Sequence, residues 1–199
     1  MPRNVAILLF DEVEVLDFAG PFEIFSVTGR RDEGAPPFNV YTVAEKSGTI
    51  SARNNLIITP HYTIDNCPPP EIILIPGGYG SRAAMRNPAI LDWVQRQHQH
   101  TELTLSVCTG ALVLGTAGLL DGLQATTHYG SYDLLGEVAP NTTVVRGVRY
   151  VDNGKVVTSA GVQAGMDMSL HIIARLCGEA QARETAHYIE YQWEPQPQL

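Results

Sequence analysis

Hydrophobic and polar residues alternate along this 199-residue chain at two spacings, one typical of strands and the other of helices. Continuous aliphatic runs at 5–10 and 71–76 predict strands buried on both faces of a parallel sheet, and β-prone segments at 38–44 and 103–107 predict two more. Apolar residues three or four positions apart predict helices over 16–25, 88–98, 109–117, 162–176 and 179–191. This order predicts an α/β fold with a doubly wound, mostly parallel sheet, right-handed crossovers and helices on both faces.

Shorter segments complete the predicted fold. Turn residues between 47 and 62 predict an antiparallel excursion beside the sheet. Strands are also predicted over 124–128, 142–150 and 155–159, the last two on either side of a turn at 152–154. Pro21 lies in the predicted helix 16–25 and is compatible only with its first turn. Because no linker or repeat interrupts the chain, we expect a single domain over 1–199, in which 193–199 form a frayed tail.

Cys108 lies where the strand pattern of 103–107 changes to the helical spacing that begins at Thr109. A residue in such a turn projects its side chain at the carboxyl edge of the sheet, where open α/β proteins bind ligands, and a nucleophile elbow has the same geometry. The N–H groups and dipole of the following helix favour the thiolate, so we expect a lowered thiol pKa and preferential alkylation of Cys108. The alternative is a buried cysteine that packs as a small hydrophobe.

Three further sites lie close to predicted strand ends. Asp17 follows the first strand near the start of helix 16–25, where an N-cap is the simplest interpretation. The loop Gly77-Gly78-Tyr79-Gly80 follows strand 71–76 and can turn backbone N–H groups towards an anion, although it has neither Walker nor dinucleotide-binding spacing. His128 ends the short strand 124–128, near the edge that carries Cys108. It is either an acid–base partner or a solvated loop residue.

Composition narrows the function classes. The net charge of -8 argues against binding a phosphate backbone, which requires clustered Lys and Arg. No apolar run approaches the roughly 18 residues of a membrane helix, and the first residues do not form a signal peptide. The three cysteines (Cys67, Cys108 and Cys177) are widely spaced and form no ligand cluster with histidines, so we expect a reduced, cytoplasmic setting and no metal ligation.

Five motifs along nearly the whole chain resemble, in order, those of the ThiJ/PfpI superfamily. They are Leu-Asp-Phe-Ala-Gly-Pro (16–21), Ile-Pro-Gly-Gly-Tyr-Gly (75–80), Ser-Val-Cys-Thr-Gly-Ala (106–111), Ala-Thr-Thr-His-Tyr (125–129) and Ser-Ala-Gly-Val-Gln-Ala-Gly-Met-Asp (159–167). The resemblance implies a flavodoxin-like fold related to class I glutamine amidotransferases. The chain is most similar to the isonitrile hydratase branch, in which a Cys-Thr pair works with an early Asp; Cys108, Thr109 and Asp17 occupy those positions.

The resemblance implies that Cys108 attacks the carbon of an isonitrile and that Asp17 supplies a proton and then helps to activate water. Thr109 and the backbone N–H groups of Gly78 and Tyr79 would position water or stabilise charge, and His128 would contact substrate without an essential step. Family geometry would bring Asp17 against Cys108, so that one of the two stays protonated and they titrate as a pair. A homodimer is expected by analogy, with a small-molecule substrate as the other partner.

Two alternatives remain open. One is a cysteine enzyme of the glyoxalase, amidase or peptidase type, which attacks a carbonyl and relies on His128. The other is a sensor without catalytic activity. Such a sensor would respond to a small ligand, as in the N-terminal domain of AraC-type regulators that this pattern also resembles, or to an oxidant that converts Cys108 to its sulfenate or sulfinate.

Overall fold

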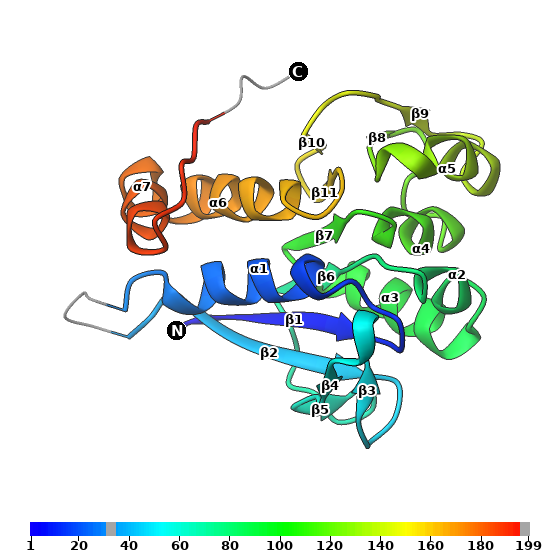
Figure 1. The fold of residues 1–199 in the computed structure, drawn as a ribbon, viewed down its shortest axis with the longest axis horizontal. Coiled ribbons are helices and arrows are strands. Elements are labelled where there is room, and N and C mark those ends of the chain that lie inside the picture. The colour runs from blue at the N-terminus through cyan, green and yellow to red at the C-terminus, as the bar shows by residue number, and fades with distance from the viewer. Residues whose placement is uncertain (31–34, 196–199) are drawn as a thin grey trace.

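The computed structural model describes residues 1–30 and 35–195, and its centre is a seven-stranded sheet in the order β10-β11-β7-β6-β1-β2-β5 (Figure 1). The strands of this sheet are β1 (Arg3–Leu9), β2 (Phe38–Ala44), β5 (Tyr62–Thr63), β6 (Ile72–Ile75), β7 (Leu103–Val107), β10 (Tyr150–Asp152) and β11 (Val156–Ser159). All neighbours pair in parallel except β10 and β11. The predicted doubly wound, mostly parallel sheet is therefore confirmed.

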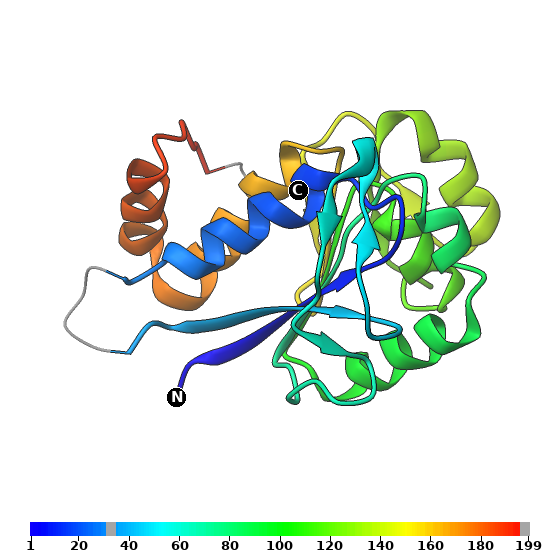
Figure 2. The same cartoon turned by 60° about the horizontal axis from the view of Figure 1, so that its bottom comes forward.

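Helices cover both faces of the sheet, as Figure 2 shows. One face carries α1 (Val15–Val27), α6 (Ala164–Cys177) and α7 (Glu179–Tyr188). The other carries α2 (Ser81–Ala84), α3 (Pro88–His100), α4 (Gly110–Thr116) and α5 (Tyr132–Val138). The aliphatic residues of β1 and β6, at the centre of the sheet, are almost fully buried between these layers, as their continuous hydrophobic runs predict. No helix in the described part of the chain combines the length and apolar character needed to cross a membrane.

Short elements form two small sheets separate from the main one. The excursion predicted between 47 and 62 contains the antiparallel pair β3 (Ile50–Ser51) and β4 (Ile57–Ile58), with the 3₁₀ turn η1 (Arg53–Asn55) between them. The segment predicted as strand 124–128 is regular only over β8 (Gln124–Ala125), which pairs with β9 (Thr143–Val144) in a separate sheet and precedes the 3₁₀ turn η2 (Tyr129–Ser131). The prediction of a continuous strand over 142–150 was wrong, because the chain leaves β9 and joins the main sheet only at β10.

Two local expectations differ from the structure. Pro21 lies in the middle of α1 rather than in its first turn, although an interior proline lacks one N–H donor and costs a helix roughly 3 kcal/mol. Pro21 is itself buried, so the packing of α1 against the core offsets that cost. The tail that was predicted to be frayed begins at Trp193. The Trp193 side chain is instead buried (7% exposed) and lies under the Arg183 guanidinium. Residues 196–199 of this tail lie outside the described residues.

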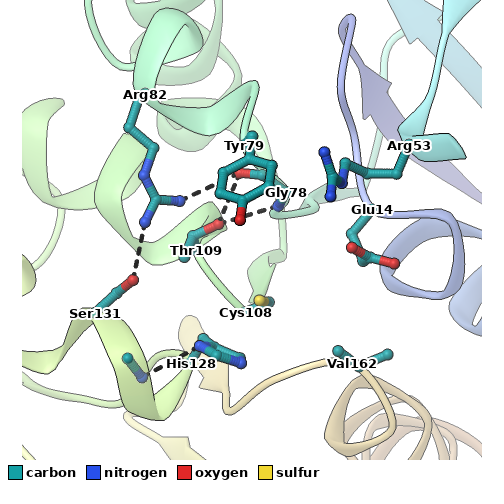
Figure 3. Close-up of a pocket in the computed structure, with 11 residues that line it drawn as sticks. Glu14, Arg53, Gly78, Tyr79, Arg82, Cys108, Thr109, His128, Ser131 and Val162 are labelled. Carbon is teal, nitrogen blue, oxygen red and sulfur yellow. Dashed lines mark hydrogen bonds between the residues drawn. The ribbon is translucent and has the colours of Figure 1, made fainter.

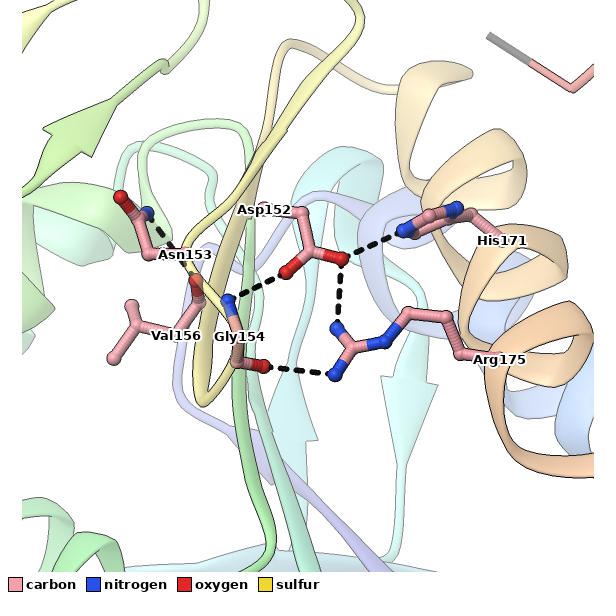
Figure 4. Close-up of polar contacts among 6 residues, drawn as sticks. All are labelled: Asp152, Asn153, Gly154, Val156, His171 and Arg175. Atoms are coloured by element: carbon pink, nitrogen blue, oxygen red, sulfur yellow. Dashed lines mark hydrogen bonds and ion pairs between the residues drawn. The ribbon is translucent and has the colours of Figure 1, made fainter. Parts of the chain in front are cut away.

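A partly buried ionic cluster ties the β10–β11 turn to α6 (Figure 4). Asp152 accepts hydrogen bonds from His171 Nε2, Arg175 Nη1 and the Gly154 N–H, each at 2.7 Å. Arg175 Nη2 also donates to the Gly154 carbonyl at 3.0 Å. Burial alone would raise the pKa of Asp152, but the bonds from His171 and Gly154 and the charge of Arg175 outweigh it and hold that pKa below its ordinary value.

We expect the Asp152→Asn variant to lower the free energy of unfolding at neutral pH by about 1–3 kcal/mol, because an amide cannot replace a carboxylate that accepts three donors. The pKa of Asp152 is lowered by folding, so its contribution is present above the unfolded pKa and is lost as the pH falls through the folded one. Urea unfolding at several pH values checks this, with Asp65→Asn, at an exposed carboxylate, as the matched control. Equal stability of the two variants at neutral pH would contradict it.

Candidate active site

Cys108 occupies the turn between β7 and α4 in a left-handed backbone conformation, with φ of 55°. Non-glycine residues rarely adopt this conformation, and here the surroundings impose it. The Cys108 N–H donates to the carbonyls of Ser159 (3.1 Å) and Ala160 (3.2 Å), and its own carbonyl accepts from Thr127 Oγ1 (2.7 Å). The predicted strand–helix elbow is therefore confirmed, at the carboxyl end of a central parallel strand.

Asp17 lies in the first turn of α1 and is completely buried. Its Oδ2 accepts a hydrogen bond from the Gly77 N–H at 2.9 Å, and the carboxyl group also interacts with the Cys108 side chain. Within the described part of the chain, no N–H or O–H group donates to the buried Oδ1. The N-cap interpretation of Asp17 was wrong, because Glu14 occupies the cap position and the Asp17 side chain points into the site instead.

The loop after β6 requires its two glycines. A Cβ at Gly77 would lie 2.5 Å from the Thr109 nitrogen and 2.8 Å from Asp17 Oδ2, so any side chain there would push Thr109 and Asp17 away from the loop. Gly78 has φ of 111°, and a Cβ there would lie 2.4 Å from the Glu12 carbonyl oxygen. The loop is thus held closer to the elbow than any residue with a side chain would allow.

Thr109 anchors that loop through its hydroxyl group. Thr109 Oγ1 accepts from the Gly78 N–H (3.0 Å) and from Ser81 Oγ (3.0 Å), and it donates to the Gly78 carbonyl (3.1 Å). The Gly78 N–H is therefore engaged and cannot freely bind an anion. An isolated antiparallel bridge between Val13 and Gly78 also holds the backbone of this loop against the segment before α1.

The electrostatics of Cys108 and Asp17 are coupled. Burial raises the pKa of Asp17 to about 7, against the weaker lowering effect of the Gly77 hydrogen bond. Burial and then the Asp17 charge raise the pKa of the Cys108 thiol to about 12. The lowered thiol pKa that the elbow predicts was therefore wrong: the Thr109 and Val162 N–H groups favour the thiolate, but less than burial disfavours it. Between about pH 7 and 12 the pair holds one proton.

Val162 is a site residue that the sequence reasoning did not single out. Its N–H hydrogen-bonds to both Cys108 and Asp17, so it helps to hold the two side chains together. Val162 has φ of 51°, which is a genuine outlier for a β-branched residue. The only sequence signal was its place after Gly161 at the start of the helix predicted over 162–176, a helix that in the structure begins at Ala164.

A cavity of about 310 Å³ opens above Cys108 (Figure 3). His128 lines it, but its Nδ1 accepts from the Gly130 N–H (3.2 Å), and no hydrogen bond joins it to Cys108 among the described residues. The sequence analysis also missed four polar or charged residues that line this cavity, Glu14, Arg53, Arg82 and Ser131. The cavity is lined by Glu14, Arg53, Gly78, Tyr79, Arg82, Cys108, Thr109, His128, Gly130, Ser131 and Val162.

Comparison with known proteins places this site in a family. The model of the DJ-1/PfpI family matches residues 3–175. The chain belongs to the DJ-1/PfpI family.

Across the described residues, no group of three or more His, Cys, Asp or Glu side chains is arranged to hold a metal ion.

Several known proteins are similar to this chain over most of its length. An isonitrile hydratase of Pseudomonas putida is 32% identical over 194 residues, which cover 96% of this chain and 79% of that protein. The transcriptional regulator GbdR of Pseudomonas aeruginosa is 27% identical over 87% of this chain, which spans about half the regulator's length (47%). The crystal structure of a ThiJ/PfpI family protein from Pseudomonas syringae superposes with a TM-score of 0.87 at 28% identity, covering 98% of this chain and 77% of that chain.

We expect alkylation of Cys108 by iodoacetamide to accelerate as the pH rises through about 7, because ionised Asp17 then accepts the thiol proton. In the Asp17→Asn variant this step should disappear, and alkylation at pH 8 should be at least about tenfold slower, because burial still raises the thiol pKa and no carboxylate remains to accept the thiol proton. Peptide mass spectrometry measures each cysteine separately, with Cys67 and Cys177 as internal references. The same pH profile in both proteins would rule out a shared proton.

The Asp17→Asn variant should also stabilise the fold above pH 7. Folding raises the pKa of Asp17, so the stability linked to its proton is complete below the unfolded pKa and is lost as the pH rises through about 7. The variant avoids this loss, which amounts to a few kcal/mol because each pKa unit corresponds to about 1.4 kcal/mol. Thermal unfolding between pH 4 and 9 checks this, with the exposed Glu23→Gln on the same helix as control. A difference between wild type and Asp17→Asn that does not change with pH would contradict it.

Proposed function

We propose that this protein is a cofactor-independent enzyme that adds water to an isonitrile to give an N-substituted formamide. One observation carries the proposal: the buried carboxyl group of Asp17, with a pKa of about 7, interacts with the Cys108 side chain. This pair supplies both things that an isonitrile carbon needs, a sulfur nucleophile and a proton. The overall resemblance of the chain to an isonitrile hydratase supports the same reaction.

The proposed reaction uses the single proton that Cys108 and Asp17 share. The Cys108 sulfur forms a bond to the terminal carbon of the isonitrile, and the proton passes through Asp17 to that same carbon, which gives a covalent thioimidate. The Asp17 carboxylate that remains accepts a proton from water, and the water oxygen bonds to the thioimidate carbon. Asp17 passes this proton to the thioimidate nitrogen. The carbon–sulfur bond then breaks as the hydroxyl group on the same carbon gives up its proton through Asp17 to the departing sulfur, and the N-substituted formamide leaves.

The site is better suited to protonating carbon than to stabilising an oxyanion. Attack on an isonitrile places negative charge on carbon, which only a proton donor can neutralise, whereas attack on a carbonyl places it on oxygen. Asp17 is a donor beside the sulfur, while the Gly78 N–H that would bind an oxyanion is engaged by Thr109. In this proposal Thr109 positions the loop, and Tyr79 and His128, which line the cavity, contact the substrate.

A second candidate is a ligand-sensing module, which the similarity to GbdR over 87% of this chain favours. The cavity above Cys108 would then bind a small molecule without converting it. Turnover of isonitriles by the wild-type protein would distinguish the enzyme from the sensor.

We also propose that the protein is a homodimer in the cytoplasm, which the family resemblance supports. Size-exclusion chromatography with light scattering would test the oligomeric state.

We expect Cys108→Ala to abolish isonitrile hydration, because the covalent step loses its nucleophile. Asp17→Asn should keep the fold and lower kcat/KM by at least about 100-fold, the range typical of a lost general acid. His128→Ala should change kcat/KM by less than about threefold. The measurement is formamide formation from a panel of isonitriles, with folding checked by circular dichroism.

The reverse order of effects would favour attack on a carbonyl. In that case His128→Ala would be inactive, Asp17→Asn would retain activity, and 2-oxoaldehydes in a parallel panel would be converted to hydroxy acids. Wild-type turnover in Cys108→Ala would remove the sulfur from the mechanism. If the wild type converts neither class of substrate, the sensor becomes the leading function.

A further inference from the structure

The cavity above Cys108 carries an arginine whose charge no carboxylate offsets. Arg82 comes from α2, directly after the glycine loop, and is half-buried on the cavity wall (Figure 3). Its Nη1 donates to the Gly78 carbonyl (3.3 Å) and Ser81 Oγ (3.2 Å), and its Nη2 donates to Ser131 Oγ (3.0 Å). All three acceptors are neutral. Among the described residues, Arg82 takes part in no ion pair.

The second arginine of the cavity is in a different situation. Arg53 forms an ion pair with Glu12 at 2.8 Å, and its guanidinium stacks over the Tyr79 ring at 4.2 Å. Glu14 lines the same side of the cavity, as Figure 3 shows. With Glu12 and Glu14 close to a single arginine, that side of the cavity has no excess positive charge. The side that carries Arg82 and Ser131 keeps a net positive charge, in a chain whose overall charge is -8.

Hydrogen bonds fix the position of Arg82 relative to the elbow. Ser81 Oγ and the Gly78 carbonyl, which both accept from Arg82, are also the direct partners of Thr109 Oγ1. The guanidinium is thus held one hydrogen-bonded group away from the residue that follows Cys108. Only some of its five N–H donors are used by these bonds, and a planar guanidinium with free donors matches the two oxygens of a carboxylate.

We propose that Arg82 binds the carboxylate of the substrate, so that the natural isonitrile of this protein is a small isonitrile-bearing carboxylic acid. The assignment of the reacting group rests on the proposed function, but the anion site does not. A carboxylate at Arg82 would leave the other end of a small molecule within the same cavity as the Cys108 sulfur. Glu14, on the opposite side, would disfavour the reversed orientation.

Alkylation of Cys108 by iodoacetate and by iodoacetamide tests the anion site without any isonitrile. The two reagents have the same leaving group and nearly the same size but differ in charge, so the ratio of their rates cancels changes in thiol reactivity. We expect Arg82→Gln to lower the iodoacetate-to-iodoacetamide ratio at Cys108 about tenfold, and Arg82→Lys to retain most of it. Arg86→Gln, an exposed arginine nearby that does not line the cavity, should leave the ratio unchanged.

An unchanged ratio in Arg82→Gln would overturn the proposal, because an arginine that only holds the loops would alter both rates together. Kinetics with an isonitrile carboxylic acid and its neutral amide then test the substrate class. We expect the acid to have the higher kcat/KM in the wild type, and Arg82→Gln to remove that preference mainly through KM. Equal kcat/KM for acid and amide would reject the substrate class. A charge-dependent alkylation ratio without turnover of either compound would reject the hydratase function and retain the anion site.

Discussion

The burial of the Asp17 carboxyl group next to the Cys108 side chain is the constraint on which the site depends. Burial makes both groups costly to ionise, so one proton stays with the pair over the neutral pH range. The surrounding backbone adapts to this arrangement. Gly77 must lack a side chain to reach the carboxyl group, and Cys108 and Val162 both take left-handed conformations.

Local sequence pattern was enough to predict the framework of the site. The change from strand to helical spacing placed Cys108 at an elbow, because that geometry depends on a few consecutive residues. The continuous aliphatic runs identified β1 and β6 as central parallel strands, since only strands buried on both faces lack polar positions. The loop after β6 was expected at the same edge because parallel strands end together. Family motifs, rather than local pattern, linked Asp17 to Cys108.

Features that depend on tertiary burial were not readable from the sequence. A helix start after Cys108 suggested a lowered thiol pKa, but burial and the neighbouring carboxyl group determine the sign. Val162 touches both residues of the pair through its backbone N–H, which any residue type could provide. Arg82 comes from a four-residue helix without a periodic signal. Pro21 remained inside α1 because packing against the core outweighed helix propensity, which is a weak local effect.

The most direct test of this account is the titration of the Asp17 carboxyl carbon by ¹³C NMR, with its signal assigned by its absence in Asp17→Asn. The shared-proton pair predicts a midpoint near pH 7, and the signal should report a protonated carboxyl group at pH 5. An Asp17 signal that titrates near 3.8, the ordinary value for aspartate, would contradict the account. The carboxyl group would then be ionised throughout the neutral range, and it could not deliver the proton that hydration of an isonitrile requires.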